Sequence, residues 1–318
     1  MQKPIVVVGS INLDLVAGAD RIPRVGETIV GNSFHTFYGG KGGNQAVAVA
    51  KLGYPVSMVG NVGSDAFGTE LRVGLKDAGV DAAYVNIVDG PSGVALITTE
   101  RGGENNIVVV PGANGWLTPK LMEKAAHTLE RAGFILAQLE IPLETVEYLT
   151  QFAERHDIPL MLDPSPAREL PAALLRRLTW ITPNETETQK LLKTDIANAD
   201  QDSDAAAERL LDCGVKNVLL KLGSRGCLVA QGTLAKERVP AFEVEAVDTT
   251  AAGDAFNAGF AVGLMRGFTV AQSAVFASAV AAISVTRPGA QSSMPTLPEV
   301  QAFLSERLGA ASFVETSA

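Results

Sequence analysis

Cysteine and histidine are scarce in this 318-residue sequence, and their scarcity excludes two classes of protein. The two cysteines, Cys213 and Cys227, are too few for a disulfide framework. The three histidines, His35, His127 and His156, lie far apart and show no spacing typical of zinc ligands. Neither a disulfide-stapled scaffold nor a structural zinc site is therefore expected.

Long uninterrupted apolar runs are also missing. The N-terminus reads Met-Gln-Lys-Pro and then enters Ile5–Val8, an apolar run too short for the core of a signal peptide. The Ala-rich segment from Val270 to Val285 comes closest to membrane-spanning length without reaching it. We therefore expect a cytoplasmic protein with no membrane partner.

Positive charge is in deficit. The sequence has 35 acidic and 26 basic residues, a formal net charge of -9. This balance argues against sequence-independent binding of nucleic acid, so no nucleic-acid partner is expected. A local Lys, an Arg or a helix N-terminus can still bind a small anion. Hydrophobic residues make up 47% of the chain, which is ample for a large core.

Short apolar runs rich in β-branched residues alternate with helical periodicity. Five runs are predicted to be buried strands: Ile5–Val8, Val56–Val59, Phe134–Ala137, Leu160–Leu162 and Val218–Leu222. Between the third and fourth runs, apolar residues recur at helical spacing, at Leu143, Val146, Leu149 and Ala153. The alternation predicts an α/β fold with a doubly wound, mostly parallel sheet covered on both faces.

Two segments, residues 13–37 and 93–110, break this alternation with short extended stretches. The run from Gly102 to Asn106 between two such stretches indicates a hairpin connection. We interpret these segments as a small, separate β-sheet lid over a cleft; edge strands of the main sheet are the alternative. One domain is expected over residues 1–308 with this discontinuous lid, followed by a disordered tail at 309–318.

The strongest chemical motif is the segment from Asp248 to Asp254, which runs into a helix that is apolar nearly all round. Small residues and Gly253 at a helix start leave backbone N–H groups open, and the helix dipole favours an anion there. Asp254 fits a general base that takes a proton from a hydroxyl while the N–H groups stabilise a transferring phosphoryl group. A simple helix-capping role for Asp254 is the alternative.

A second glycine cluster runs from Gly39 to Asn44 before a predicted helix. It is not a P-loop, because His35 stands where that motif requires glycine and Gly42 where it requires Ser or Thr. What remains is backbone that can approach a polar ligand closely, with Lys41 and Asn44 as donors. A mobile surface turn is the alternative.

The first predicted strand leads to Gly9, Asn12 and Asp14. The G-x-G-x-x-G pattern is missing after it, so a nicotinamide-dependent enzyme is disfavoured. Asn12 and Asp14 alternate along an extended segment and would lie on one face, where an amide and a carboxylate suit sugar hydroxyls. An Asx turn would explain the two residues equally well.

Two weaker elements follow. The segment from Pro183 to Glu187 is predicted to begin a helix, and its carboxylates would suit Mg²⁺ bound through water. Charge complementarity at a helix N-terminus is the plainer interpretation. The Gly-rich turn from Lys221 to Gly226 follows a predicted strand and could lie along a nucleotide.

Together these motifs resemble those of the PfkB carbohydrate-kinase family, over nearly the whole chain from Gly9 to Gln291. Residues 39–46 and 248–254 correspond to the family's two signature motifs. The resemblance implies a kinase with a β-sheet lid, ATP and Mg²⁺ as cofactors and K⁺ as a monovalent activator. It also implies a homodimer formed through the lids.

The resemblance further implies a role for individual residues. Asp254 would be the catalytic base, and the backbone N–H groups of Ala251, Ala252 and Gly253 would form an anion hole. The sugar would be held by Asn12, Asp14, Gly40, Lys41, Asn44, Glu140 and Asp254. ATP would contact Asn184, Lys221, Gly223, Ser224, Gly226, Gly253 and Ser278, with Glu187 acting indirectly on Mg²⁺. K⁺ would be bound, mostly by backbone oxygens, at Asp248, Thr250, Ser284, Arg287, Gly289 and Ser293.

The acceptor expected from this resemblance is D-ribose, phosphorylated at O5 to ribose 5-phosphate. Asn12 supports ribose, because an amide beside Asp14 can bind a 2-hydroxyl that deoxyribose lacks. Deoxyribose, a ketohexose and a nucleoside remain alternatives, since aromatic residues such as Phe34 and Phe37 could stack on a base. A sugar-binding regulator without catalysis is disfavoured, because Gly253 and Asp254 are both present.

Overall fold

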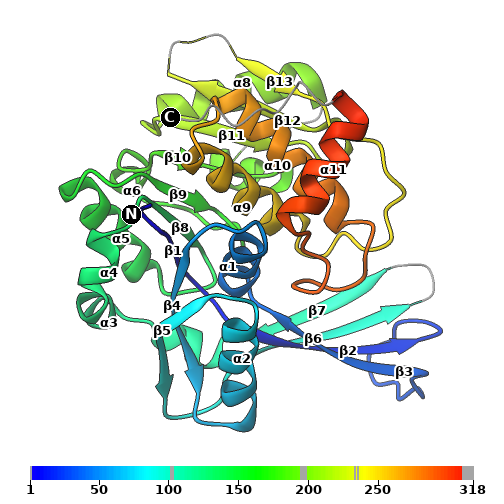
Figure 1. The fold of residues 1–318 in the computed structure, drawn as a ribbon. Coiled ribbons are helices and arrows are strands. Elements are labelled where there is room, and N and C mark those ends of the chain that lie inside the picture. Colours follow the sequence, from blue (N-terminus) through cyan, green and yellow to red (C-terminus); the bar gives the residue numbers. More distant parts are fainter. Residues whose placement is uncertain (1, 101–103, 194–198, 233, 235, 310–318) are drawn as a thin grey trace.

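A nine-stranded, mostly parallel sheet forms the centre of the molecule in the computed structural model, which describes residues 2–100, 104–193, 199–232, 234 and 236–309 (Figure 1). The strands from β11 to β5 are all parallel, and β12 pairs antiparallel with both β11 and β13. This confirms the predicted sheet. In spatial order it contains β13 (Glu237–Val239), β12 (Cys227–Gln231), β11 (Asn217–Lys221), β10 (Trp180–Ile181), β9 (Leu160–Asp163), β8 (Phe134–Gln138), β1 (Ile5–Val8), β4 (Val56–Gly63) and β5 (Asp81–Val88).

Helices cover both faces of this sheet. Successive strand residues point to opposite faces, so Ile5 and Val7 join one hydrophobic core while Val6 and Val8 join the other. The first core is completed by α1 (Lys41–Lys51), α2 (Ala66–Asp77), α9 (Ala252–Met265), α10 (Val270–Ser284) and α11 (Leu297–Leu308). The second is completed by α3 (Pro119–Lys124), α4 (Ala126–Glu130), α5 (Leu143–Arg155), α6 (Ala172–Leu175), α7 (Glu185–Leu192) and α8 (Ala199–Asp212).

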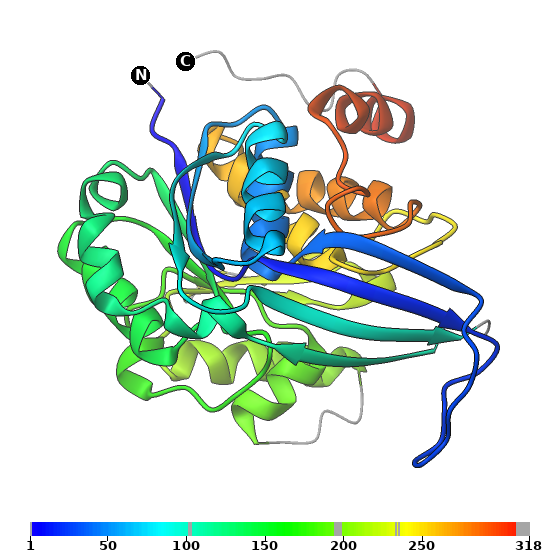
Figure 2. The same cartoon turned by 90° about the horizontal axis from the view of Figure 1, so that it is seen from below.

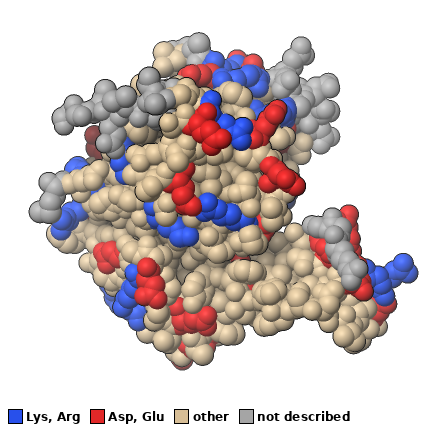
Figure 3. Space-filling model, turned by 45° about the vertical axis from the view of Figure 1, so that its right-hand side comes forward, with Lys and Arg blue, Asp and Glu red and all other residues tan. Residues whose placement is uncertain are grey.

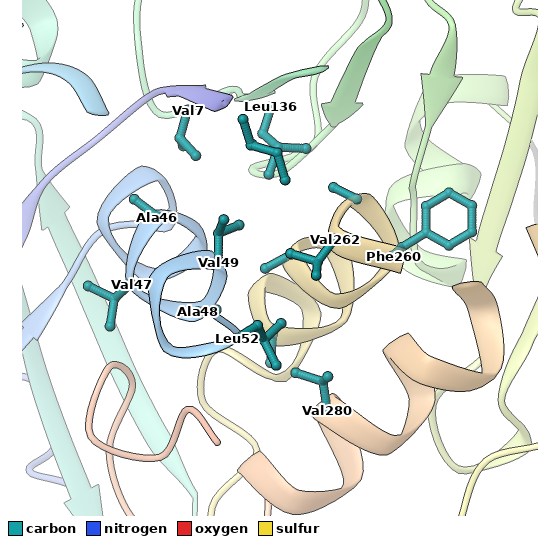
Figure 4. Packing of buried hydrophobic residues seen from close by; sticks show 14 of the residues in the cluster. Val7, Ala46, Val47, Ala48, Val49, Leu52, Leu136, Phe260, Val262 and Val280 are labelled. Carbon is teal, nitrogen blue, oxygen red and sulfur yellow. The ribbon is translucent and has the colours of Figure 1, made fainter. Parts of the chain in front are cut away.

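Helices α1 and α9 pack side by side on the sheet, and α10 packs under α9. Figure 4 shows Val49 of α1 on the side of this helix that faces Val262 of α9. Glycine allows α9 and α10 to approach closely: a Cβ on Gly259 would lie 2.9 Å from the Cα of Ala277. Helix α9, which the sequence predicts to be apolar nearly all round, is therefore buried, as expected, and so is most of α10.

A second, four-stranded sheet projects from the body, and we call it the small sheet (Figures 1 and 2). Its order is β3 (Ser33–Gly39), β2 (Asn12–Ala19), β6 (Gly93–Glu100) and β7 (Asn105–Val110). Within the described residues these strands pair only with one another, so the alternative of edge strands on the main sheet is wrong. Strands β6 and β7 pair antiparallel, as the predicted hairpin requires. Residues 101–103 of that connection, and 310–318 of the predicted tail, lie outside the described residues.

The carboxyl ends of the parallel strands meet at one edge of the large sheet, beside the small sheet. Gln138 ends β8, Asp163 ends β9 and Lys221 ends β11. Strand β2 begins shortly after β1 and leaves this same edge. In open α/β sheets this edge is where ligands bind. No helix among the described residues is long and apolar enough to span a membrane.

Candidate active site

The N-terminus of α9 lies at this edge with its first turn uncapped by any side chain. Ala251, the residue before the helix, has a left-handed backbone with φ of 58°, which turns the chain sharply into Ala252. The ammonium of Lys221 lies beside this turn, because a Cβ added to Gly253 would be 3.4 Å from its Nζ. Ala252 N donates to Thr249 O at 3.2 Å, and the rest of the first turn of α9, the helix dipole and a lysine surround one point that suits an anion.

Asp254 follows directly in α9 and is buried, with 3% of its surface exposed. Its carboxylate does not cap its own helix. Instead, Asn44 Nδ2 donates to Oδ2 and Gln45 Nε2 donates to Oδ1, both at 3.0 Å from α1. The capping alternative is therefore wrong, and the two signature segments meet at Asp254.

The pKa of Asp254 reflects opposing influences. Burial raises it, and the carboxylate of Asp163 raises it further. The ammonium of Lys41 and the hydrogen bonds from Asn44 and Gln45 lower it. Burial dominates, so the pKa of Asp254 lies above its usual range, which favours a general base.

Asn12 and Asp14 both lie in β2 and are buried on the same face of the small sheet, so the Asx-turn alternative is wrong. Asn114, which lies in the 3-10 helix Gly112–Trp116, donates through Nδ2 to Asn12 Oδ1 at 2.7 Å. The same Asn114 accepts a hydrogen bond from the backbone N–H of Ile11. Asn12 is thereby held with its own amide N–H groups available to a ligand.

Glycines bring the backbone close to this pair. A Cβ on Gly39 would lie 2.3 Å from Asp14 Oδ2, and one on Gly40 would lie 2.6 Å from the backbone nitrogen of Asn12. Gly40 also has φ of 81°, a conformation that favours glycine. The alternative of a mobile surface turn is wrong, because Gly40 and Gly42–Gln45 are buried, whereas the close approach of this backbone to a ligand stays a prediction.

Three carboxylates gather around the space between β2 and α9. Burial raises the pKa of Asp14 to about 7, and the nearby charges of Glu140 and Asp254 raise it too. Glu140 follows β8, and its Oε2 accepts from Ser10 Oγ at 2.5 Å and from the backbone N–H of Lys41 at 3.2 Å. Asp14, Glu140 and Asp254 therefore come from three separate elements to one polar site.

Lys41 supplies the positive charge for these acids. Burial lowers the pKa of its ammonium, but four carboxylates outweigh burial and hold the pKa above its usual range. In decreasing order of effect these are Asp254, Asp163, Glu140 and Glu187. Lys41 is therefore a permanent cation beside carboxylates of both predicted sets, those for the sugar, such as Glu140, and those for the nucleotide, such as Glu187.

Most of the residues predicted to contact ATP follow the strands β10 and β11. Asn184 and Glu187 form a capping box at the start of α7: Glu187 N donates to Asn184 Oδ1 and Asn184 N donates to Glu187 Oε2, both at 2.8 Å. Lys221 Nζ donates to Asp163 Oδ1 at 3.1 Å, deep in the site. Asn184 and Glu187 therefore have a structural role in capping α7.

The turn after β11 is compact. Gly223 and Ser224 lie in the exposed 3-10 turn Gly223–Arg225, and Arg225 pairs with Glu185 at 2.5 Å. A Cβ on Gly226 would lie 2.0 Å from the carbonyl oxygen of Val239, so only glycine fits there. The backbone of this turn is presented at the same edge as Lys221.

Ser278 lies one layer away, in α10. It is buried, and its Oγ has no hydrogen-bond partner within the described part of the chain. An unpartnered buried hydroxyl is unusual, so a ligand or water at this position would satisfy it.

The residues predicted to hold K⁺ come together in two adjoining segments, 247–250 and 284–293. Asp248 joins them, because its Oδ1 accepts from Thr250 N at 2.9 Å and its Oδ2 accepts from Gly289 N at 2.8 Å. Burial raises the pKa of Asp248, but these hydrogen bonds outweigh burial and lower it overall. Arg287 turns its guanidinium away to Glu299, at 2.7 Å.

The two segments also contain oxygen donors of the kind that hard cations prefer. Ser284 O accepts from Arg287 N at 3.2 Å, and Ser293 Oγ donates to Ala290 O at 2.8 Å. The donor set of Asp248, Thr250, Ser284, Arg287, Gly289 and Ser293 consists of carbonyl, hydroxyl and carboxylate oxygens and so fits a monovalent cation. Among the described residues there is no cluster of three or more His, Cys, Asp or Glu side chains for another metal.

The molecular surface is hollowed where the small sheet meets the body (Figure 3). Charged side chains gather at the tip of the small sheet, where Arg21 pairs with Glu27. Most of its surface in this view is uncharged. The polar residues of the site are therefore buried at the base of the small sheet rather than spread over it.

Sequence reasoning missed five polar residues of this site: Ser10, Gln45, Asn114, Gln138 and Asp163. Gln138 and Asp163 directly follow apolar runs that were predicted as strands, so their position at a strand's carboxyl end was a usable signal. Asn114 carried no such signal, because its contact with Asn12 spans 102 residues.

The fold and site define a class: a doubly wound α/β enzyme with an uncapped helix N-terminus facing a buried carboxylate and a second sheet beside the cleft. Residues 2–297 match the pfkB family carbohydrate kinases. The chain is 41% identical over 304 residues to a ribokinase of Bacillus subtilis (strain 168), covering 95% of this chain and all of the relative.

Two further likenesses bear on the acceptor. A deoxyribokinase of Salmonella typhi is 38% identical, over 95% of this chain and 98% of the relative. The solved structure of Arabidopsis thaliana ribokinase complexed with ribose and ATP is 35% identical, with a TM-score of 0.90 over 96% of this chain and 99% of that one.

The chain belongs to the pfkB family of carbohydrate kinases. It is an ATP-dependent sugar kinase.

Proposed function

We propose that this kinase transfers the γ-phosphoryl group of ATP to O5 of D-ribose, with Asp254 as the general base. The observation that carries the proposal is the setting of Asp254: a buried carboxylate of raised pKa, beside an uncapped helix N-terminus and within reach of sugar-side donors. The similarity to relatives named ribokinase, one of them solved with ribose and ATP, supports the choice of acceptor.

The sugar would lie between β2 and α1. Asn12 Nδ2 and the carboxylate of Asp14 would bind its hydroxyls from one side, with the backbone of Gly40 close by. Asn44, Lys41 and Glu140 would bind it from the other side. Asn44 Oδ1 is buried without a hydrogen-bond partner in the described residues, and a sugar hydroxyl would satisfy it.

The phosphoryl group would pass over the N-terminus of α9. Asp254 would take the proton of the acceptor hydroxyl as its oxygen attacks the γ-phosphorus and the bond to the leaving ADP oxygen breaks. The backbone N–H groups of Ala251, Ala252 and Gly253 would stabilise the charge that develops on the phosphoryl oxygens, together with the nearby ammonium of Lys221. The small sheet would act as a lid and keep water, a competing acceptor, away.

Two cations belong to this proposal. Mg²⁺, held indirectly by Glu187 and by the ATP phosphates, would neutralise charge on the transferring group. K⁺, held by the 248–250 and 284–293 segments, would order the loop that leads into Ala251. Asn184, Gly223, Ser224, Gly226 and Ser278 would contact the nucleotide from the opposite side of the cleft.

The test is coupled phosphorylation of a panel of ribose, 2-deoxyribose, fructose and adenosine, each with K⁺ and with Na⁺. A clear preference for ribose, raised by K⁺, is expected. Preference for 2-deoxyribose, as the deoxyribokinase relative suggests, would overturn the role of Asn12 at the 2-hydroxyl. Preference for fructose or adenosine would overturn the pentose assignment and leave the base and anion hole to be tested separately.

Asp254→Asn tests the base. The amide keeps the size of the side chain but cannot take a proton, so kcat should fall by about 10²–10⁴-fold. Ribose binding, followed by calorimetry, should persist because the sugar-side donors are intact. Unchanged kcat in a folded variant would remove Asp254 from the mechanism.

A homodimer formed through the lids belongs to the same proposal. All six residues of β7 are exposed, and the strand carries Ile107, Val108, Val109 and Val110 in succession. Such an apolar edge strand favours a partner. The cytoplasmic location stays a prediction.

A further inference from the structure

Two glutamines that the proposed mechanism does not use form a chain of hydrogen bonds that ends at Asp254 Oδ1. A carboxylate oxygen only accepts hydrogen bonds, so Gln45 must present its NH₂ group to Oδ1, at 3.0 Å. Its Oε1 then faces the opposite way and accepts from Gln138 Nε2 at 2.8 Å. Gln45 and Gln138 are each 1% exposed, so water does not compete for these bonds.

Gln138 is held in place by the strands around it. It ends β8, and its Oε1 occupies the space that a side chain on Gly9 would need, 2.0 Å from the position of an added Cβ. Gly9, at the end of β1, is therefore a glycine because Gln138 fills its side-chain space. Gln138 Oε1 has no hydrogen-bond partner among the described residues, so the direction of the chain Gln138 to Gln45 to Asp254 is set by the Asp254 carboxylate, which requires the NH₂ group of Gln45.

The two oxygens of Asp254 have different surroundings. Oδ1 faces this buried relay, whereas Oδ2 accepts from Asn44, whose own Oδ1 lacks a partner in the described chain and lies on the sugar side. We propose that Gln138 and Gln45 are positioning residues that anchor Asp254 Oδ1 and thereby present Oδ2 as the atom that takes the acceptor's proton. This inference deepens the proposed function and rests on Asp254 being the base.

Charged groups on four neighbouring elements also face Asp254 or lie beside it. Lys41 of α1 lowers its pKa, and Asp163 of β9 raises it. Asp14 of β2 is electrostatically coupled to it, and Lys221 of β11 lies next to Gly253. The bond from Gln45 is one of the influences that keep the carboxylate ionised, so its loss should raise the pKa of Asp254.

The experiment compares Gln45→Met, Gln138→Met and the double variant, since methionine is similarly long and unbranched but cannot donate. Each pH profile is measured with whichever panel sugar the wild type phosphorylates, so a wrong acceptor leaves this test intact. We expect kcat to fall on the order of 10- to 100-fold for Gln45→Met, with a smaller change in sugar KM. The acid limb of kcat should move to higher pH. Gln151→Met, on the exposed face of α5, is the matched control and should behave like wild type.

The double variant is the decisive comparison. If Gln138 acts only through Gln45, the double variant should match Gln45→Met, whereas independent roles would multiply the two losses. Gln138→Met with wild-type kcat and an unmoved acid limb, or multiplied losses, would overturn the relay. Thermal unfolding identifies a variant that has lost its fold. In that case the variant Gln138→Glu is used instead, and the pKa of Asp254 is measured in it by ¹³C titration. Glutamate accepts a hydrogen bond where Gln138 donates one, so Gln45 would turn its NH₂ group away from Asp254 and the pKa of Asp254 should still move to higher pH.

Discussion

At the scale of single residues, burial acts on two carboxylates of this site in different ways. Asp254 is buried but receives two amide hydrogen bonds and faces Lys41, so part of the effect of burial is offset. Asp14 is also buried, and the charges of Glu140 and Asp254 add to the effect, which brings its pKa to about 7. Asp14 therefore titrates near neutral pH in the ligand-free protein.

This titration predicts how sugar binding depends on pH. An ionised Asp14 accepts hydrogen bonds from sugar hydroxyls, so the dissociation constant for ribose should rise as pH falls below about 7. Asp14→Asn should bind ribose more weakly and without this dependence. Calorimetry between pH 5.5 and pH 8.5 measures both, and an equally pH-dependent Asp14→Asn variant would assign the titration to another group.

The raised pKa of Asp14 also affects the stability of the protein. An ionised Asp14 favours ribose binding but lowers the free energy of unfolding. The folded state keeps the proton of Asp14 up to about pH 7, whereas the unfolded chain loses it near 3.8. Between these values the folded state binds more protons, so the contribution of Asp14 to the free energy of unfolding falls as pH rises. Asp14→Asn should therefore raise the melting temperature at pH 8 more than at pH 4.5, while it weakens ribose binding.

Residues were predictable where they formed part of a contiguous motif. Lys41 and Asn44 lie in a glycine-rich segment and Asp254 ends a segment of small residues with one glycine, and the composition of both segments indicates an anion or polar ligand. Gln45 was missed although it lies within the first of these segments, and Asp163 was missed although it directly follows a predicted strand, because a polar side chain in either place has many possible partners. Its partner is decided by which strands become neighbours.

At the scale of elements, helix α7 begins at a capping box formed by two residues that are also predicted to serve the ATP site. Both polar groups of the box are used within the helix, so Asn184 contributes to stability as well as to the proposed ATP site. A contact with nucleotide would be added to this role rather than replace it.

Two substitutions separate the roles of Asn184. Asn184→Ala removes the cap and should lower the free energy of unfolding by about 1 kcal/mol, measured by urea denaturation. Asn184→Asp keeps an acceptor for Glu187 N and should leave stability near the wild-type value, while its negative charge raises the KM for ATP. An unchanged KM for ATP in Asn184→Asp would leave Asn184 with the structural role alone.

The elements themselves were largely predictable. Buried parallel strands read as continuous apolar runs, and β1, β8 and β9 were recognised for that reason. The edge strand β5 gave no such run, because exposed and buried positions are mixed along it. The two-residue strand β10 is too short to carry a pattern of its own.

At the scale of the whole molecule, the small sheet contacts more than the sugar site. A Cβ on Gly289, in the predicted K⁺ loop, would lie 3.0 Å from Cδ1 of Phe37 in β3. Gln291 of the same loop lies 3.5 Å from Gly39 O through its Nε2. The loop, the small sheet and the first signature segment are therefore in contact with one another.

The lid proposal predicts the effect of charge on one face of the small sheet. The strand pairing places Val109 and Ile107 on the face that carries Asn12 and Asp14. Replacing both by Lys should convert a dimer to a monomer in light scattering and raise the KM for ribose. Val73→Lys, at an equally exposed valine on α2, is the control and should remain dimeric. A double variant that stays dimeric would place the interface elsewhere.

By itself, the sequence determined the α/β class and the segments that carry the chemistry, because apolar periodicity and motifs of small residues are local properties of the chain; it located the strands of the small sheet but left their pairing to the structure. Tertiary structure alone decided which polar side chains meet. Gln45 and Asp254 are 209 residues apart, and Lys221 and Asp163 are 58 apart. Their contacts exist because parallel strands bring their carboxyl ends to one edge and α1 packs beside α9, and no local pattern encodes that order.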